Sequence, residues 1–506
     1  HRCQLRRRER LNIMGTRIIK RHPSHLPVGD DHPYRQGAWT PNLTEYDARE
    51  LEVLEGEVPT DLNGVYLRNT ENPLFPALER YHPFDGDGML HAVHFRGGKA
   101  DYRNRLIPTR GLAEELAAGE TLFAGILEDP ALSKRPGWGA RQGMKDASST
   151  DVVVHAGRAL TTFYQCGDAY ACDPVTLEPL GRETWNGGFP EDWGVSAHTK
   201  VDERARELLF FSYAKQAPYL RFGVVDASRN VVHHTDIELP GPRLPHDLAF
   251  TEHHVIVNDF PLFWDPKLLA KGIHHPRLFG DLPTRFGVLP RRAPGSEVRW
   301  FEAPPTYALH FVNAYEDGNE IVLDGYPQED PAPRRREDDG PYSMLMRYID
   351  LHTLRTHLTR WRLDLGTGKV TTERLDERIS EFPMIHGRYG GRRHRYVYAM
   401  TSKPGWFLFN GLLKHDLERR ETQSYEFPEG VFASESPFAP RSESLDPSLE
   451  DDGHVVTLVT DTVHDRSECQ IFDAKAISRG PVARLRLPER ISSGTHSFFV
   501  PTWDLS

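Results

Sequence analysis

Short runs of apolar residues, each about the length of one strand, recur along the whole chain. They are rich in Val, Ile, Leu, Phe and Tyr, and turn-forming residues separate them at short intervals. The clearest runs are DVVVH at 151–155, LLFFSY at 208–213, HVIVN at 254–258, EIVLD at 320–324, RYVYAM at 395–400 and VVTLVT at 455–460. Helical patterns are few and short, the better candidates being residues 46–53 and 266–271. Many short strands without alternating long helices predict an all-β sandwich, barrel or propeller.

The length of the chain narrows this choice. At 506 residues it exceeds what one small core can organise, so it holds several domains or repeats one unit around an axis. A propeller accommodates this number of strands most naturally, although no blade motif repeats clearly along the sequence. We expect residues 1–30 to form a mobile N-terminal extension, and residues 31–506 to form a single β-propeller domain.

Charge and composition exclude several functional classes. The formal net charge of −11 argues against a nucleic-acid partner, because phosphate binding needs a basic face. No stretch approaches the ~20 apolar residues of a membrane-spanning helix, which predicts a soluble protein. The four cysteines are too few and too scattered for a disulfide framework, and predict reduced thiols in a cytoplasmic protein. Residues 259–278 mix Phe, Trp, Leu and Ile with Lys and His, which fits equally a patch that dips into a membrane and a segment packed on the rim of the fold.

Four of the 25 histidines stand at or beside the end of an apolar, strand-like run: His198, His246, His310 and His496. Their separations of 48, 64 and 186 residues fit no local metal motif. A shared site would therefore require the fold to gather distant strands, as a propeller does when the innermost strand of each blade lines the axis. Taken singly, each histidine is more often a hydrogen-bonded strand residue than a ligand.

Longer sequence words surround these histidines. Residues 63–105 read NGVYLRNTENPLFPALERYHPFDGDGMLHAVHFRGGKADYRNR. The later words, in chain order, are AHTKVD at 197–202, HDLAFT at 246–251, FGVLPRR at 286–292, HFVNAYE at 310–316, EFP at 381–383, ESPFAPR at 435–441, EDDG at 450–453 and SGTHSFF at 493–499. Between residues 45 and 503 the chain resembles the carotenoid cleavage oxygenases, because at least eight of that family's words occur in the family's order.

The resemblance implies a seven-bladed β-propeller with short helices and loops capping the active-site face. It also implies one Fe(II) held by His198, His246, His310 and His496, with two cis positions left open. A ligating histidine usually gives its second N–H to an acceptor, and the family uses three glutamates for this. Glu381 and Glu435 match two of them, whereas the third position falls on Gln165. A glutamine carbonyl can accept the imidazole N–H without bringing charge, so we expect a more positive site that binds iron more weakly or has a raised potential.

The implied reaction inserts both atoms of dioxygen across an alkene bond and gives two carbonyl products, so the partners are dioxygen and a lipophilic alkene. The words at 63–105 favour a carotenoid or apocarotenoid substrate. Stilbene cleavers of the family hold the substrate's 4-hydroxyl with a Tyr and a Lys, where this chain has Ile126 and Tyr164. Cleavage of a stilbene or phenylpropene stays open as an alternative. A binding propeller without catalysis and a retinoid-ester isomerase are further alternatives.

Overall fold

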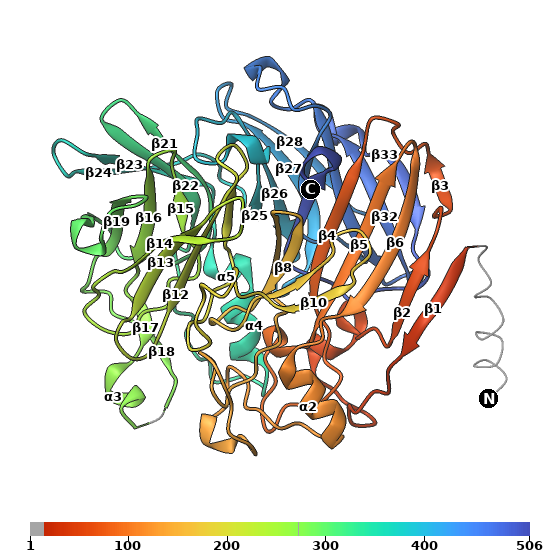
Figure 1. Cartoon of the computed structure of the whole chain (residues 1–506), viewed down its shortest axis with the longest axis horizontal. Helices are drawn as coiled ribbons and strands as arrows, with labels where there is room; N and C mark the ends of the chain where they lie inside the picture. Colours follow the sequence, from red (N-terminus) through yellow and green to blue (C-terminus); the bar gives the residue numbers. More distant parts are fainter. Residues whose placement is uncertain (1–14, 272, 506) are drawn as a thin grey trace.

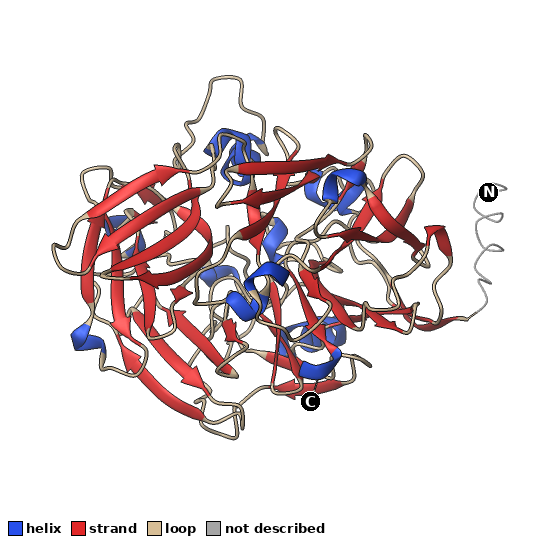
Figure 2. Ribbon diagram, turned by 90° about the horizontal axis from the view of Figure 1, so that it is seen from above, coloured by secondary structure: helices blue, strands red, loops and turns tan. Residues whose placement is uncertain are grey.

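The computed structural model describes residues 15–271 and 273–505, which form seven large β-sheets grouped around a central region and one two-stranded hairpin (Figures 1 and 2). Five sheets have four strands each, all antiparallel. In sheet order these are β7 (Asp151–His155), β8 (Arg158–Thr162), β9 (Tyr170–Cys172) and β10 (Pro179–Arg182); β11 (Lys200–Asp202), β12 (Glu207–Tyr213), β13 (Leu220–Val225) and β14 (Val231–Asp236); β15 (Ala249–Phe250), β16 (His254–Asp259), β19 (Thr284–Pro290) and β20 (Arg299–Ala303); β21 (Ala308–Asp317), β22 (Glu320–Pro327), β23 (Thr359–Asp364) and β24 (Val370–Arg374); and β25 (Glu381–Met384), β26 (Tyr396–Ser402), β27 (Phe409–Asp416) and β28 (Glu421–Glu426). This is the predicted all-β, seven-bladed propeller.

The two remaining sheets close the ring, because each contains strands from both ends of the chain (Figure 1). One contains β1 (Thr16–Arg21), β2 (Thr44–Ala48), β6 (Lys99–Leu106), β5 (Gly88–Arg96), β4 (Gly64–Glu71) and the C-terminal β34 (Ser497–Pro501). The other contains β29 (Val431–Phe432), β30 (Phe438–Pro440), β31 (Gly453–Asp461), β32 (Arg466–Asp473), β33 (Pro481–Arg486) and the N-terminal β3 (Val53–Gly56). Pairing of β34 with β4 and of β3 with β33 ties the two ends of the chain into the first and last blades and so closes the ring.

Helices are minor in the part of the chain that the structure describes. They are α2 (Arg110–Ala118), α3 (Pro266–Leu269), α4 (Ser343–Ile349) and α5 (Leu351–Leu354), and a small hairpin pairs β17 (Leu262–Trp264) with β18 (Pro276–Leu278). None of the described helices is long and apolar enough to span a membrane. The helix α2 begins where Thr109 accepts a hydrogen bond from Leu112 N–H, and ends at Gly119, whose φ of 72° suits a residue without a Cβ.

The apolar runs predict the strands well: five of the six quoted runs lie within a strand, and the sixth, at 395–400, begins one residue before β26. The predicted helix at 266–271 is confirmed in part by α3, but the one at 46–53 is wrong. That segment forms the end of β2 and leads into β3, because β2 lies between β1 and β6 and Tyr46 N–H donates to the Asn104 side chain. Sheet pairing overrides the local helical preference here.

Part of the predicted N-terminal extension forms a strand. Residues 16–21 form β1, which pairs antiparallel with β2 from Thr16↔Ala48 to Arg21↔Thr44. The extension predicted over residues 1–30 is therefore wrong for this part, because backbone pairing makes β1 the outer strand of its sheet. Residues 1–14 lie outside the described residues.

The aromatic residues expected on a membrane-facing patch are buried. Phe260, Phe263 and Trp264 are each at most 4% exposed, and Phe260 and Trp264 belong to the largest hydrophobic core. Ile273 is half exposed at 50%. The aromatic part of residues 259–278 therefore packs on the propeller, and membrane contact by this segment stays a prediction.

Four of the sequence words tie neighbouring blades together in pairs. Asp202 of AHTKVD accepts from Arg291 of FGVLPRR at 2.7 Å, and both side chains are at most 9% exposed. Glu316 of HFVNAYE accepts from the Thr251 hydroxyl at 2.6 Å and lies 2.8 Å from the His253 ring. These words hold the blades in position around the axis, where the four histidines lie.

Candidate metal centre

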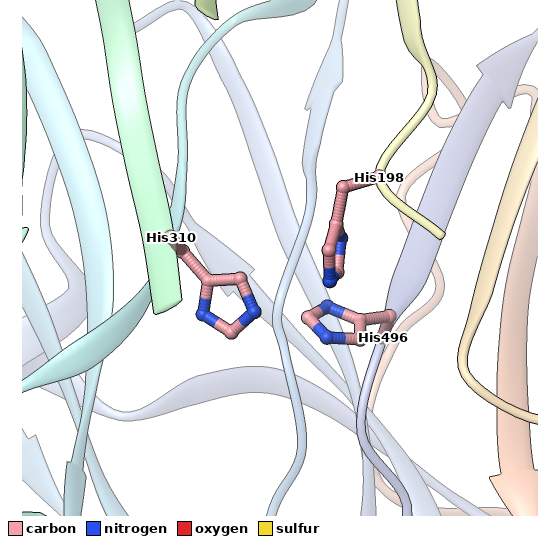
Figure 3. A group of neighbouring side chains, drawn as sticks. All are labelled: His198, His310 and His496. Carbon is pink, nitrogen blue, oxygen red and sulfur yellow. The ribbon is translucent and has the colours of Figure 1, made fainter. Parts of the chain in front are cut away.

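The innermost strands bring the four predicted histidines together. His310 lies in β21, and the other three stand shortly before the inner strands β11, β15 and β34. All four are 3–5% exposed. The rings of His198, His310 and His496 point toward one another from different parts of the chain (Figure 3). The fold thus supplies the convergence that the sequence spacing required.

The ring nitrogens are close enough to share a metal ion. Ligand atoms of His198, His310 and His496 all lie within 4.8 Å of one another. His246 is outside that group, but its Nε2 lies 3.1 Å from His198 Nε2. Two cis imidazoles about 2.1 Å from one metal ion would be separated by ~3.0 Å. His310 Nε2 is buried and has no hydrogen-bond partner among the described residues, as expected of a donor that faces a metal. The donor set therefore fits a divalent transition metal.

Two glutamates fix the orientation of two of these rings. Glu381, the first residue of β25, lies 2.7 Å from His310 Nδ1. Glu435, between β29 and β30, lies 3.0 Å from His496 Nδ1. Both carboxylates lie where the resemblance implies them. A proton on Nδ1 leaves the Nε2 lone pair free to face the centre.

A third carboxylate, Asp151, escaped the sequence reasoning. Its Oδ2 lies 3.1 Å from His198 Nδ1 and accepts the His198 backbone N–H at 3.0 Å. His198 has a φ of +66°, in the left-handed region that non-glycine residues rarely adopt. The available signal was an acidic residue that opens an otherwise apolar strand, DVVVH, and a buried aspartate there needs a partner.

Among the described residues, no imidazole N–H is bound by Gln165, which was predicted to accept one. Arg141 Nη1 donates to the Gln165 backbone carbonyl at 3.2 Å and to its Oε1 at 3.4 Å. Within the described residues, His246 Nδ1 is buried without a hydrogen-bond partner, and its ring packs against Tyr164 at 4.9 Å between centroids. The difference arises because the guanidinium of Arg141 attracts both carbonyl oxygens of residue 165.

The centre is assembled from one residue of each blade. Four blades give histidines and three give carboxylates, all at or beside the innermost strand. In chain order they are Asp151 at β7, His198 at β11, His246 at β15, His310 at β21, Glu381 at β25, Glu435 between β29 and β30, and His496 at β34. Gln165 lies between β8 and β9, away from an innermost strand.

Burial controls the charge of the rings. It lowers the pKa of His198, His246 and His310 well below the usual value, so these imidazoles are neutral and their lone pairs are available. Burial also lowers the pKa of His496, but the Glu435 carboxylate outweighs it and raises this pKa to about 9. Burial raises the pKa of Glu381 to about 8. A nearby dication would supply the positive charge that favours its carboxylate form.

Aromatic side chains form an apolar wall beside the histidines. The Phe382 ring lies 4.9 Å from His310 and 4.7 Å from His496 between centroids. Phe407 packs on Phe382, and Phe84 contacts both Phe407 and Tyr164. A cavity of about 180 Å³ also reaches His198, His310 and His496 and is lined by Lys200 and Asp247, which form an ion pair at 2.7 Å. The centre therefore has apolar rings packed beside it and a cavity whose mostly apolar lining contains one ion pair.

The chain is similar to known proteins over nearly its whole length. Residues 39–501 match the family described as retinal pigment epithelial membrane protein. The chain is 30% identical to carotenoid 9,10(9',10')-cleavage dioxygenase 1 of Phaseolus vulgaris, over 97% of this chain and 93% of that protein. It is also 30% identical to isoeugenol monooxygenase of Pseudomonas nitroreducens, over 93% of this chain and 98% of that protein.

Solved structures agree with the fold. The lignostilbene dioxygenase of Pseudomonas brassicacearum superposes with a TM-score of 0.82 at 26% identity, over 94% of this chain and 100% of that one. The cobalt-substituted apocarotenoid oxygenase of Synechocystis superposes with a TM-score of 0.79 at 25% identity, over 92% of this chain and 98% of that one. Similarity thus extends equally to proteins named for carotenoid and for phenylpropene or stilbene substrates.

Proposed function

Because this chain belongs to the retinal pigment epithelial membrane protein family, which includes the carotenoid oxygenases, we propose that it is a non-haem Fe(II) dioxygenase that cleaves a carbon–carbon double bond of a carotenoid or apocarotenoid. That it is an oxygenase follows from its relatives. The single observation that carries the metal assignment is the convergence of four buried histidines with ring nitrogens 3.1 Å apart at the closest.

The residues of the chain have distinct tasks in this proposal. His198, His246, His310 and His496 hold the ion, and bound Fe(II) supplies the redox chemistry that activates dioxygen. Glu381 and Glu435 keep the protons of two rings on Nδ1. One alkene and one dioxygen give two carbonyl groups, so atoms and electrons balance without a further reductant.

The apolar wall supports a hydrophobic conjugated substrate. Phe84, Phe382 and Phe407 keep the surroundings of the histidines apolar, which suits a planar polyene. A phenylpropene or stilbene is the second candidate, since the chain is as similar to isoeugenol monooxygenase as to the plant carotenoid enzymes. The Tyr and Lys that grip a phenol in the stilbene cleavers are replaced here by Ile126 and Tyr164, which favours the polyene.

The test is aerobic incubation of iron-loaded protein with apocarotenoids, carotenoids, isoeugenol and hydroxystilbenes, with products identified by mass. We expect paired carbonyl fragments from a polyene, none from His310→Ala, and unchanged products from His454→Ala. His454 is an equally buried histidine that lies 2.9 Å from Asp61, outside the group of four. Cleavage of the phenolic substrates alone would replace the polyene by the second candidate. Iron-bound protein that cleaves no member of the panel would contradict the proposal.

A further inference from the structure

Asp151 contacts a proposed metal ligand, but the function stated above gives it no role. We propose that Asp151 is a positioning residue that supplies, on His198, the third carboxylate that the family pattern places at residue 165. The inference rests on the proposed metal site. Of the four proposed ligands, His246 is then the one whose Nδ1 has no carboxylate partner among the described residues.

The contacts of Asp151 repeat those of the two glutamates. Each of the three carboxylates lies 2.7–3.1 Å from an imidazole Nδ1. Each also accepts a backbone N–H at the centre: Glu381 from Phe382, Glu435 from Ser497 and Asp151 from His198. Glu435 and Asp151 thus fix both a ring and the backbone at that histidine, whereas the backbone contact of Glu381 is with the residue that follows it. Because Asp151 shares the Nδ1 contact with both glutamates and the backbone contact with Glu435, it belongs to the same set.

The backbone contact matters most at His198. Its φ of +66° carries a cost of roughly 1–2 kcal/mol for a residue with a Cβ, so the surrounding structure must enforce it. The hydrogen bond from His198 N–H to Asp151 Oδ2 is a direct constraint of that kind. It turns the ring so that Nε2 approaches His246 Nε2. Asp151 thus acts on the metal through the conformation of His198.

Gln165 is held away from the role that the sequence predicted for it. Arg141 is 8% exposed, and its Nε donates to the Lys145 carbonyl at 3.0 Å, which fixes the guanidinium. Its Nη1 donates hydrogen bonds to the backbone carbonyl and to Oε1 of Gln165. The ring of His246 is left to packing against Tyr164. Removal of the Gln165 side chain should therefore disturb the metal less than removal of the Asp151 charge.

The total charge of the centre changes little when Asp151 stands in for a carboxylate at residue 165. Three carboxylates stand beside four histidines, so the total equals that of a site with three glutamates. The sequence-based expectation of a more positive centre is replaced by one of equal charge with a different distribution. His198 becomes a more basic ligand, and His246 a less basic one.

The experiment compares Asp151→Asn with Gln165→Ala, using Asp324→Asn as a matched control. An asparagine keeps an acceptor for the His198 N–H but loses the charge, and Asp324 is a buried carboxylate paired with Arg360 away from the centre. Co(II) affinity is measured by chelator competition, and the hyperfine-shifted imidazole N–H signals of the Co(II) protein are recorded by NMR. We expect Asp151→Asn to weaken Co(II) binding about 10–100-fold and to move one N–H signal. The other two variants should stay within about threefold of the wild type.

The outcomes separate the inference from the function on which it rests. Wild-type protein that binds no Co(II) or Fe(II) would refute the metal site itself. If the wild type binds metal and Gln165→Ala weakens binding more than Asp151→Asn, the acceptor is Gln165 and the inference is wrong. Equal losses in Asp151→Asn and Asp324→Asn, with no N–H signal moved, would reduce Asp151 to a structural residue and also overturn it.

Discussion

Metal binding should stabilise the whole propeller, because the four histidines come from four different blades. The unfolded chain cannot hold together ligands that are 48, 64 and 186 residues apart, so the ion binds the folded state far better. Free metal at 1,000 times its Kd then adds about 4.1 kcal/mol to the free energy of unfolding. An unfolding entropy of about 2.1 cal/mol/K per residue corresponds to ~1 kcal/mol/K for this chain. The melting temperature should therefore rise by ~4 °C.

The assay is thermal unfolding followed by circular dichroism, with anaerobic Fe(II) or with Co(II) titrated into chelator-treated protein. His310→Ala, which removes one of the three most tightly grouped ligands, should lose most of the shift. His454→Ala should keep it. A wild-type melting temperature that does not respond to metal would refute the reasoning. So would an equal shift in His310→Ala, because it would show binding to the chain's other histidines.

Three further predictions follow from named contacts. Glu435→Gln should weaken metal affinity about 10–100-fold, because it removes the negative charge beside His496 Nδ1. Chelator competition measures this affinity, and an unchanged Kd would refute the prediction. Arg291→Met should lower the free energy of unfolding by about 3 kcal/mol in urea titrations, because the Asp202 carboxylate loses one of the two arginines that pair with it. The Asp202 side chain is 0% exposed, so water cannot replace the lost partner. A decrease below about 1 kcal/mol would contradict this prediction. For Glu316, burial raises the carboxyl pKa but hydrogen bonds from Thr251, His253 and His254 outweigh it and lower the pKa to about 2. Its stabilising effect should be complete above pH 4.5 and disappear toward pH 2, so the melting temperatures of wild type and Glu316→Gln should converge over that range; a constant difference would argue against it.

The sequence predicts the strands because their apolar runs are also the buried positions of the sheets. DVVVH coincides with β7, where all five residues are buried. The segment at 46–53 was predicted incorrectly because its strand exists through pairing with β1 and β6, which are distant in sequence. Closure by β34 and β3 is likewise set by contacts between the two ends of the chain, which no local pattern records.

The candidate site shows the same division. The sequence words identified the four histidines and two glutamates, whose side chains the fold brings together. The words could not show that Arg141 donates hydrogen bonds to both oxygens of Gln165, because residues 141 and 165 meet only where a loop packs on the blade. They also gave no role to Asp151, whose contact with His198 joins the inner strands of two neighbouring blades. Individual partners depend on side-chain geometry, whereas the strands follow from the apolar runs and the ligand types from the family resemblance of the surrounding words.

The central claim is that both atoms of dioxygen enter the products at the four-histidine centre. The most direct measurement is single-turnover cleavage under ¹⁸O₂ by the iron-loaded protein, with rapid mass analysis of both carbonyl fragments before exchange with water. We expect one ¹⁸O atom in each fragment, and no cleavage by His310→Ala. Label in only one fragment, or products that form equally well without dioxygen, would contradict it.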